Sequence, residues 1–251
     1  FFNYLFPLLF FFALVQLLGA TAGDEISYVV SMVLVLGILG NGLFGAGMRA
    51  VQEREANILR RYRVAPITAT PLLVASMFTG WAVFLPTLFG VIALAHTIYG
   101  MPIPERWLSL LVLVSIGVIA FRAIGLILAS VANSTQESSI LIQLLYMPML
   151  FLSGATFPLE SLPPWARLAA QFLPATYLVT GFQGVFHRNE SLAENTASLL
   201  ALLATILLAT FVSVQLFRWE KEEKIRPSAK LWVLAVLLPF FFLGSYQIWN
   251  R

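Results

Sequence analysis

The sequence contains no cysteine and few charged residues, and these two absences narrow the class of protein. Without cysteine the chain has no disulfide, thiolate metal site or cysteine nucleophile. Only 11% of the residues are charged while 59% are hydrophobic, a balance outside the range of ordinary soluble domains. The net charge is only +3, and the positions of the Lys and Arg residues do not fit a nucleic-acid-binding surface. We therefore expect no nucleic-acid partner. The mean hydropathy of +0.87 predicts an integral membrane protein.

Catalytic and nucleotide-binding motifs are also missing from the sequence. It has no phosphate-binding G-x-x-x-x-G-K-[ST] loop, no G-x-S-x-G motif and no histidine–carboxylate cluster with metal-ligand spacing. We therefore expect a transport protein rather than an enzyme, with no catalytic residue, metal or cofactor bound by this chain. An intramembrane lipid-modifying enzyme remains one alternative, although it would need polar side chains that converge at one membrane depth.

The long apolar runs predict an all-α polytopic membrane helix bundle. A bilayer core of about 30 Å requires roughly 20 apolar residues in a helix, and the runs are too long and uniform for barrel strands. By this measure the chain forms one permease domain, 1–251, with about seven spans. The spans are expected near residues 1–20, 27–48, 72–96, 107–131, 139–157, 197–217 and 231–249. Because the chain begins at Phe1 rather than Met, we also expect residues upstream.

No Asp or Glu lies in the middle of any predicted span. Proton-coupled carriers usually need an intramembrane carboxylate to bind and release the proton. A secondary transporter is therefore the second alternative, and neither a carboxylate of this kind nor an internal repeat supports it.

The distribution of Lys and Arg predicts the orientation of the bundle. The segments that follow the second, fourth and sixth spans together carry ten cations, while the opposite side carries four. Because cytoplasmic loops are enriched in Lys and Arg, we expect the ten-cation side to face the cytoplasm and the C-terminus to lie outside.

One charged segment, residues 49–63 (RAVQEREANILRRYR), lies between two of these spans. Its glutamates come early and most of its arginines late, the order that the dipole of a short helix favours. Its apolar residues form one stripe, so an amphipathic helix on the cytoplasmic surface is expected, with Glu53 and Glu55 exposed to solvent and to a partner. The alternative interpretation is a solvated loop that only sets the topology.

The spacing in this segment resembles that of ABC type-2 exporter permeases. In that family E-R-E-x-G-T-L follows the second span, and a proline comes after it. Here Asn57 and Ile58 replace the usual Gly and Thr, and Asn still tolerates a left-handed bend. The resemblance implies a coupling helix at 49–63 that docks on a nucleotide-binding subunit. The residues to which it assigns this role are Glu53, Arg54, Glu55, Leu59 and Pro66.

A second unusual segment follows the fifth predicted span. Four prolines break it into short pieces that are too short to cross a bilayer and too apolar for an exposed loop. A re-entrant or interfacial helical hairpin fits both properties, because irregular backbone at membrane depth must be covered by protein or face a cavity. The alternative is an ordinary outer loop. The run F-L-S-G-A-x-F-P-L-E-x-L-P-x-W, with L-P-x-T-Y after it, also resembles the outer re-entrant helices of ABC type-2 permeases. The resemblance implies an outer gate at 158–185 with the residues Pro158, Pro163, Pro164, Trp165, Pro174 and Tyr177.

Two polar residues inside spans are weaker candidates for a substrate path, namely Asn41 and Arg122. Arg122 can extend toward the cytoplasm or pair with a backbone carbonyl, or else it can line a cavity, and the sequence leaves these possibilities open. The glycines around Asn41 allow close helix approach, either within the chain or between two copies.

Taken together, the resemblance implies the membrane-spanning half of an ATP-driven exporter in a bacterial-type plasma (inner) membrane. Its substrate is expected to be amphipathic, such as a drug, a lipid or a glycan-lipid. An ABC ATPase subunit is expected to bind ATP and magnesium, and a second copy or a related permease to complete the transporter among membrane lipids. The last span, 231–249, lies outside the six-span core of the family and has no assigned role.

Overall fold

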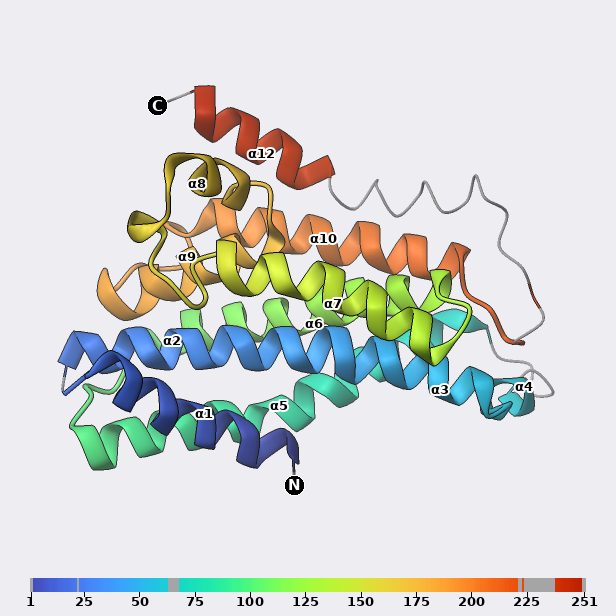
Figure 1. Cartoon of the computed structure of the whole chain (residues 1–251), viewed down its shortest axis with the longest axis horizontal. Helices are drawn as coiled ribbons and strands as arrows, with labels where there is room; N and C mark the ends of the chain where they lie inside the picture. The colour runs from blue at the N-terminus through green and yellow to red at the C-terminus, as the bar shows by residue number, and fades with distance from the viewer. Residues whose placement is uncertain (1, 22, 63–67, 221–222, 224–237, 250–251) are drawn as a thin grey trace.

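A computed structural model describes residues 2–21, 23–62, 68–220, 223 and 238–249 of the chain. All regular structure in these residues is helical (Figure 1). The elements in chain order are α1 (Phe2–Leu18), α2 (Gly23–Leu39), η1 (Gly40–Met48), α3 (Arg49–Glu55), α4 (Ile58–Tyr62), α5 (Ala69–Tyr99), α6 (Trp107–Val131), α7 (Thr135–Leu152), η2 (Leu159–Ser161), α8 (Pro164–Ala170), α9 (Pro174–His187), α10 (Thr196–Gln215) and α12 (Leu238–Trp249).

Four helices of the described chain are long and apolar enough to cross a membrane. They are the continuous helix Gly23–Glu55, which comprises α2, η1 and α3, together with α5, α6 and α10. The predicted all-α class is confirmed, but the count of seven spans is not. The other three predicted spans correspond to α1, α7 and α12. Here α1 has 17 residues and the described part of α12 has 12, while α7 has 18 residues that include a polar first turn. The predicted residues 231–237 lie outside the described residues.

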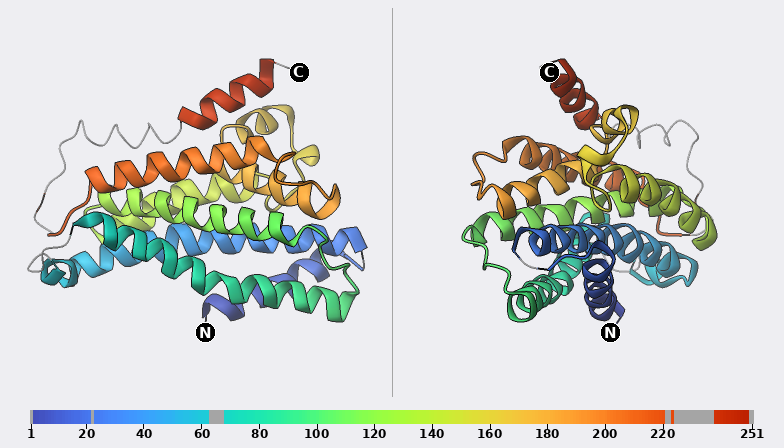
Figure 2. Two further views of the ribbon diagram at one scale, coloured as in Figure 1. Left: turned by 180° about the vertical axis from the view of Figure 1, so that it is seen from behind. Right: turned by 60° about the vertical axis from the view of Figure 1, so that its left-hand side comes forward.

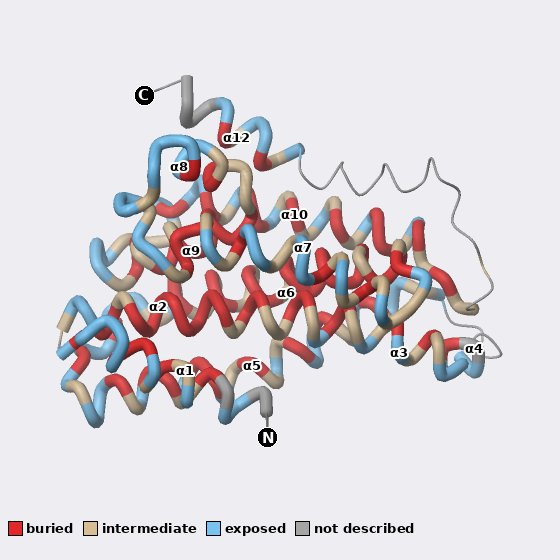
Figure 3. The backbone as a smooth tube through the Cα atoms, viewed as in Figure 1, coloured by how far each residue is buried: buried red, intermediate tan, exposed pale blue. Residues whose placement is uncertain are grey.

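The helices α2 and α6 form the centre of the bundle. In the most apolar stretch of Gly23–Glu55 and of α6, 72% of residues are buried, against 39% for α5 and α10 (Figure 3). Exposed large apolar side chains such as Phe78, Phe89 and Leu207 lie on α5 and α10. In water such faces would be unfavourable, so they are the surfaces expected to contact lipid.

Glycines allow η1 and α6 to approach backbone to backbone. A Cβ at Gly42 would lie 2.6 Å from the backbone of Phe121, and one at Gly125 would lie 2.3 Å from the carbonyl oxygen of Gly42. The first of the two interpretations of this glycine-rich segment, packing within the chain, is therefore confirmed at these positions. The same segment, Gly40–Met48, has π-helical hydrogen bonding, a wider turn that is often found at functional sites.

The chain alternates in direction, so its connections gather at two ends of the bundle (Figures 1 and 2). The segments α3 and α4, the α6–α7 turn and the end of α10 lie at one end, which we call the charged end. The other end holds α8, α9 and the α5–α6 connection. Figure 2 shows α12 on the outside of the bundle beside α8 and α10. The sequence prediction that the segments after the second, fourth and sixth spans share one side is confirmed.

Candidate functional site

The charged segment bends between α3 and α4. The helix α3 ends at Glu55, and Asn57 adopts a left-handed backbone conformation with φ 56° before α4 begins. The bend expected at Asn57 is thus confirmed. It occurs there because Asn adopts positive φ more readily than most non-glycine residues. The predicted residue Pro66 lies outside the described residues.

Arg54 turns inward rather than toward solvent. Its side chain is 3% exposed, and its two terminal nitrogens donate to the carbonyl oxygens of Ala129 at 2.9 Å and Ala132 at 2.5 Å. These carbonyls end α6, where the helix has no further backbone donors and its dipole favours a cation. Arg54 therefore joins α3 to the end of α6.

Arg218, which follows α10, reaches the same place. Its guanidinium donates to the carbonyl of Ala132 and, over 3.0 Å, to the side-chain oxygen of Asn133. Burial lowers the pKa of Arg218, while the nearby Glu137 and Glu223 carboxylates raise it. Arg218 was not among the site residues predicted from the sequence, although a cation just beyond the end of a span is favoured by the helix dipole and by the free carbonyls there.

Glu55 makes the complementary contact at the start of α7. Its carboxylate accepts from the backbone N–H of Thr135 at 3.1 Å and from the Thr135 hydroxyl. Free N–H groups and the positive end of the helix dipole both favour a carboxylate at this position. Glu55 is half-buried, so it is less exposed to solvent than expected, and its contact with a partner stays a prediction. Glu53 is also half-buried and pairs with Arg49 at 2.8 Å, so it too is not freely exposed.

The apolar stripe expected along the segment is split by the bend. Val51 and Leu59 are buried, whereas Ile58 and Tyr62 are 38% and 44% exposed. The surface that α3 and α4 present outward therefore differs from the residues assigned by the family pattern. Among the side chains that the structure describes, its exposed residues are Arg49, Gln52, Ala56, Asn57, Ile58, Arg61 and Tyr62.

The two weak candidates for a substrate path, Asn41 and Arg122, are brought together. One terminal nitrogen of Arg122 donates to the side-chain oxygen of Asn41 at 3.0 Å and to its carbonyl at 3.2 Å. The other terminal nitrogen donates to the hydroxyl of Ser76 at 3.0 Å. Two of the alternatives left open for Arg122 are therefore found together: it pairs with a backbone carbonyl, that of Asn41, and it lines a cavity, which is described next.

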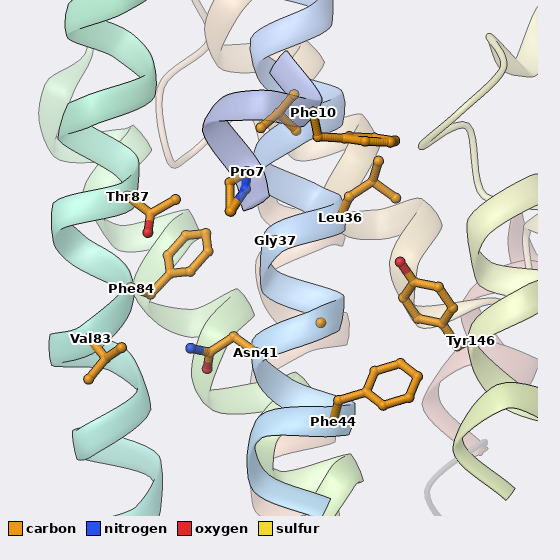
Figure 4. Close-up of a pocket in the computed structure, with 12 residues that line it drawn as sticks. Pro7, Phe10, Leu36, Gly37, Asn41, Phe44, Val83, Phe84, Thr87 and Tyr146 are labelled. Carbon is orange, nitrogen blue, oxygen red and sulfur yellow. The ribbon is translucent and has the colours of Figure 1, made fainter. Parts of the chain in front are cut away.

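Three adjoining cavities follow α2, η1 and α5 past this pair. The arginine cavity, of about 300 Å³, is lined by Arg49 and Arg122 with Asn41 and Thr79. It shares Asn41 and Phe44 with an apolar cavity of about 300 Å³, formed with α1 and α7 (Figure 4). It shares Arg122 with a charged-end cavity of about 200 Å³ that Leu59 and Tyr62 line.

The apolar cavity is bounded by aromatic side chains from several helices. Figure 4 shows Phe84 from α5 directed toward Gly37, with Pro7 and Phe10 of α1 above it. Asn41 is the polar group beneath them, and its side-chain nitrogen donates to the carbonyl of Gly80 on α5 over 3.4 Å. The lining is mostly apolar and suits the apolar part of a ligand, with Asn41, Thr87 and the hydroxyl of Tyr146 as its polar groups.

The predicted outer hairpin consists of short helices that prolines begin. Pro164 starts α8 and Pro174 starts α9, positions where the missing N–H of proline costs no helix hydrogen bond. Pro163 caps α8 and Pro158 precedes η2. The division into short pieces is confirmed, whereas re-entry into the bilayer stays a prediction.

The two aromatic residues predicted for the hairpin differ in their surroundings. Tyr177 is 3% exposed and donates to the carbonyl of Gln171 at 3.0 Å, and its ring packs against that of Phe240 of α12, with 5.5 Å between ring centres and 47° between ring planes. Trp165 is 67% exposed on α8. The structure thus joins Tyr177, but not Trp165, to the packed bundle, and it places α12 against the hairpin.

The chain is similar in sequence to a known family and to several bacterial permeases. Residues 21–214 match the sequence model of a family described as ABC-2 family transporter protein. The chain is 24% identical over 176 residues to the inner membrane transport permease YhhJ of Escherichia coli, covering 70% of this chain and 46% of the relative. It is 22% identical over 174 residues to the probable multidrug ABC transporter permease YbhS of the same organism, covering 69% and 45%. The chain therefore spans about half the length of these relatives. No solved structure matches.

Proposed function

The chain belongs to the ABC-2 family of transporter proteins, and from this premise we propose that it is the membrane-spanning subunit of an ATP-driven exporter. Permease names recur among its bacterial relatives, and two of these relatives are named probable multidrug permeases. We propose that the substrate is amphipathic and leaves the cytoplasm or the inner leaflet of a bacterial-type plasma membrane. A separate nucleotide-binding subunit binds ATP and magnesium, and a second copy or related permease completes the transporter.

The observation that carries this proposal is the hydrogen-bonded connection at the charged end. Arg54 and Glu55 tie α3 to the end of α6 and the start of α7. The helix that continues into α3 also lines all three cavities. A partner that pushes on α3 and α4 therefore moves the cavity-lining helices together, which is the mechanical requirement for coupling ATP hydrolysis to transport.

The contact surface for the ATPase is proposed to be the outward face of α3 and α4. Its centre is formed by Ile58 and Tyr62, two partly exposed apolar side chains beside the exposed Arg61. An apolar centre with a polar, solvent-accessible rim is the usual composition of a protein interface. Glu53, Arg54, Glu55 and Leu59 then act from behind this surface, by holding α3 against the bundle.

A matched pair of substitutions tests the proposal. Ile58→Asp places a charge on the proposed interface, whereas Ile103→Asp places the same charge at the opposite end of the bundle, where Ile103 is 51% exposed. The chain is purified from its native host through a tag, together with any ATPase subunit that accompanies it. We expect Ile58→Asp to reduce ATPase recovery at least tenfold because an interface centre does not accept an unpaired charge.

Ile103→Asp should recover the ATPase as the unmodified chain does. Equal recovery with both variants would move the interface elsewhere. If no subunit with a Walker motif and ATPase activity accompanies the unmodified chain, the proposed function itself is wrong.

A further inference from the structure

Arg122 is a buried cation in the middle of α6. Its side chain is 6% exposed, and its hydrogen bonds to Asn41 and Ser76 use its two terminal nitrogens. The third nitrogen, Nε, is buried without a hydrogen-bond partner. A charged group of this kind is costly at membrane depth unless it has a function or a counter-ion.

The bundle makes specific room for this side chain. Gly80 of α5 faces the guanidinium, and a Cβ there would lie 2.2 Å from its Nε and Cζ atoms. Asn41 and Ser76 hold the terminal nitrogens from two different helices, η1 and α5. The guanidinium is therefore fixed in position rather than extended toward the charged end.

The charges around the arginine cavity are of one sign. Arg49 and Arg122 both line it, and no carboxylate is among the described residues that do. The nearest acidic group on this path, Glu53, lines the charged-end cavity and is paired with Arg49. Because Glu53 compensates Arg49, the charge without a carboxylate partner at this cavity of about 300 Å³ is that of Arg122, and a buried cation of this kind favours an anion there.

The apolar cavity continues directly from this cationic one. The two cavities share Asn41, Phe44 and Val83, and the apolar one is lined further by Phe10, Phe84 and Tyr146. A ligand with an acidic group at one end and an alkyl or aromatic portion at the other would fit both cavities at once. A neutral or cationic amphiphile would leave Arg122 without a counter-ion.

We propose that the arginine cavity is the recognition site for the acidic headgroup of an amphipathic anion, whose apolar portion occupies the cavity shown in Figure 4. Arg122 provides the charge, Asn41 and Ser76 orient its guanidinium, and Gly80 leaves space for it. This deepens the proposed export function by naming the class of substrate, and it rests on that function for its role in transport. A phosphate, sulfonate or carboxylate satisfies the site equally.

The first experiment measures binding to the purified chain in phosphatidylcholine nanodiscs, without ATPase or nucleotide. The probe is dodecyl phosphate, and its uncharged counterpart is dodecyl glucoside; protein-free nanodiscs give the background. We expect dodecyl phosphate to bind the chain at least tenfold more tightly than dodecyl glucoside, because only the phosphate pairs with the guanidinium. Equal binding of both probes would overturn the proposal.

Three variants assign the selectivity to Arg122. Arg122→Gln removes the charge, and Asn41→Asp places a carboxylate of the same size beside it; each should weaken dodecyl phosphate binding at least tenfold and leave dodecyl glucoside unchanged. Arg188→Gln removes an exposed arginine at the end of α9 and should change neither. Should Arg122→Gln fail to fold, Asn41→Asp decides, and wild-type affinity in that variant overturns the proposal.

The source of the anion is resolved by changing the bilayer. If phosphatidylglycerol in the nanodisc competes with dodecyl phosphate, the site accepts an anionic lipid headgroup. If it does not compete, the site takes a smaller amphipathic anion. Because no ATPase is present, loss of anion selectivity would leave the export function standing, whereas failure to recover an ATPase would leave the anion site standing.

Discussion

The charged end and the arginine cavity each contain a buried arginine, and the two side chains are used in different ways. Arg54 is 3% exposed and donates to two carbonyls at the end of α6. Arg122 is 6% exposed, but it contacts two side chains from other helices and borders a cavity, with Nε unpartnered. The two arginine side chains are therefore buried to a similar extent, one against helix-end carbonyls and the other beside a cavity.

The difference lies in what each guanidinium satisfies. The carbonyls around Arg54 lie at a helix end without backbone donors, so Arg54, together with Arg218 at Ala132, completes the hydrogen bonding of the fold. The groups around Arg122 orient the side chain, and its charge remains uncompensated by any carboxylate lining the arginine cavity. We therefore expect Arg54 to stabilise the bundle, and we propose that Arg122 serves a ligand.

Arg54→Met gives the larger expected loss of stability. It leaves the carbonyls of Ala129 and Ala132 without the Arg54 donors, and lost hydrogen bonds to a charged group cost about 1.5–3 kcal/mol in the free energy of unfolding. A lower midpoint of thermal unfolding in detergent is the measurement. Arg61→Met, on an exposed side chain of α4, is the control and should change the free energy by less than about 0.5 kcal/mol.

The effect would also extend to function, because α3 would no longer be held against α6. If the Arg54→Met protein is as stable as the Arg61→Met control, the claim that Arg54 stabilises the bundle is wrong. Arg54 would then be available to a partner, as the family pattern assigns it.

Arg122→Met gives the smaller expected loss. Replacing a buried charge that lacks a carboxylate partner by an apolar side chain is roughly neutral or stabilising, within about 1 kcal/mol of the unmodified chain. The same thermal unfolding assay measures it, beside dodecyl phosphate binding, which should fall at least tenfold. If Arg122→Met destabilises the chain as much as Arg54→Met does, Arg122 is part of the structural framework instead.

Local sequence patterns predicted local features of the charged end well. The helical segment, its bend at Asn57 and its position on the same side as the α6–α7 turn follow from helix dipoles, backbone preferences and span counting. The burial of Arg54 and Glu55 did not, because their partners Ala132 and Thr135 lie about 80 residues further along the chain. Charge alone suggested exposure, and long-range contacts reversed it.

The candidate site in the middle of the bundle also depends on long-range contacts that local sequence patterns do not predict. A lone arginine and a lone asparagine within apolar runs mark two positions, but only the crossing of η1 and α6 at glycines brings them within 3.0 Å. The count of seven spans stays a prediction for another reason. Hydropathy alone does not distinguish a full span from a shorter apolar helix such as α1, which packs on the outside of the bundle (Figure 2), and part of the last predicted span lies outside the described residues.

Transport in inverted membrane vesicles tests the central claim, ATP-driven export, most directly. The vesicles contain this chain with its ATPase, and they are supplied with a fluorescent amphipathic anion. We predict accumulation that requires ATP, disappears when the Walker lysine of the ATPase is replaced, and persists when the proton gradient is collapsed. Accumulation that survives loss of ATPase activity and stops on collapse of the gradient would contradict the account, because the chain would then be a secondary transporter.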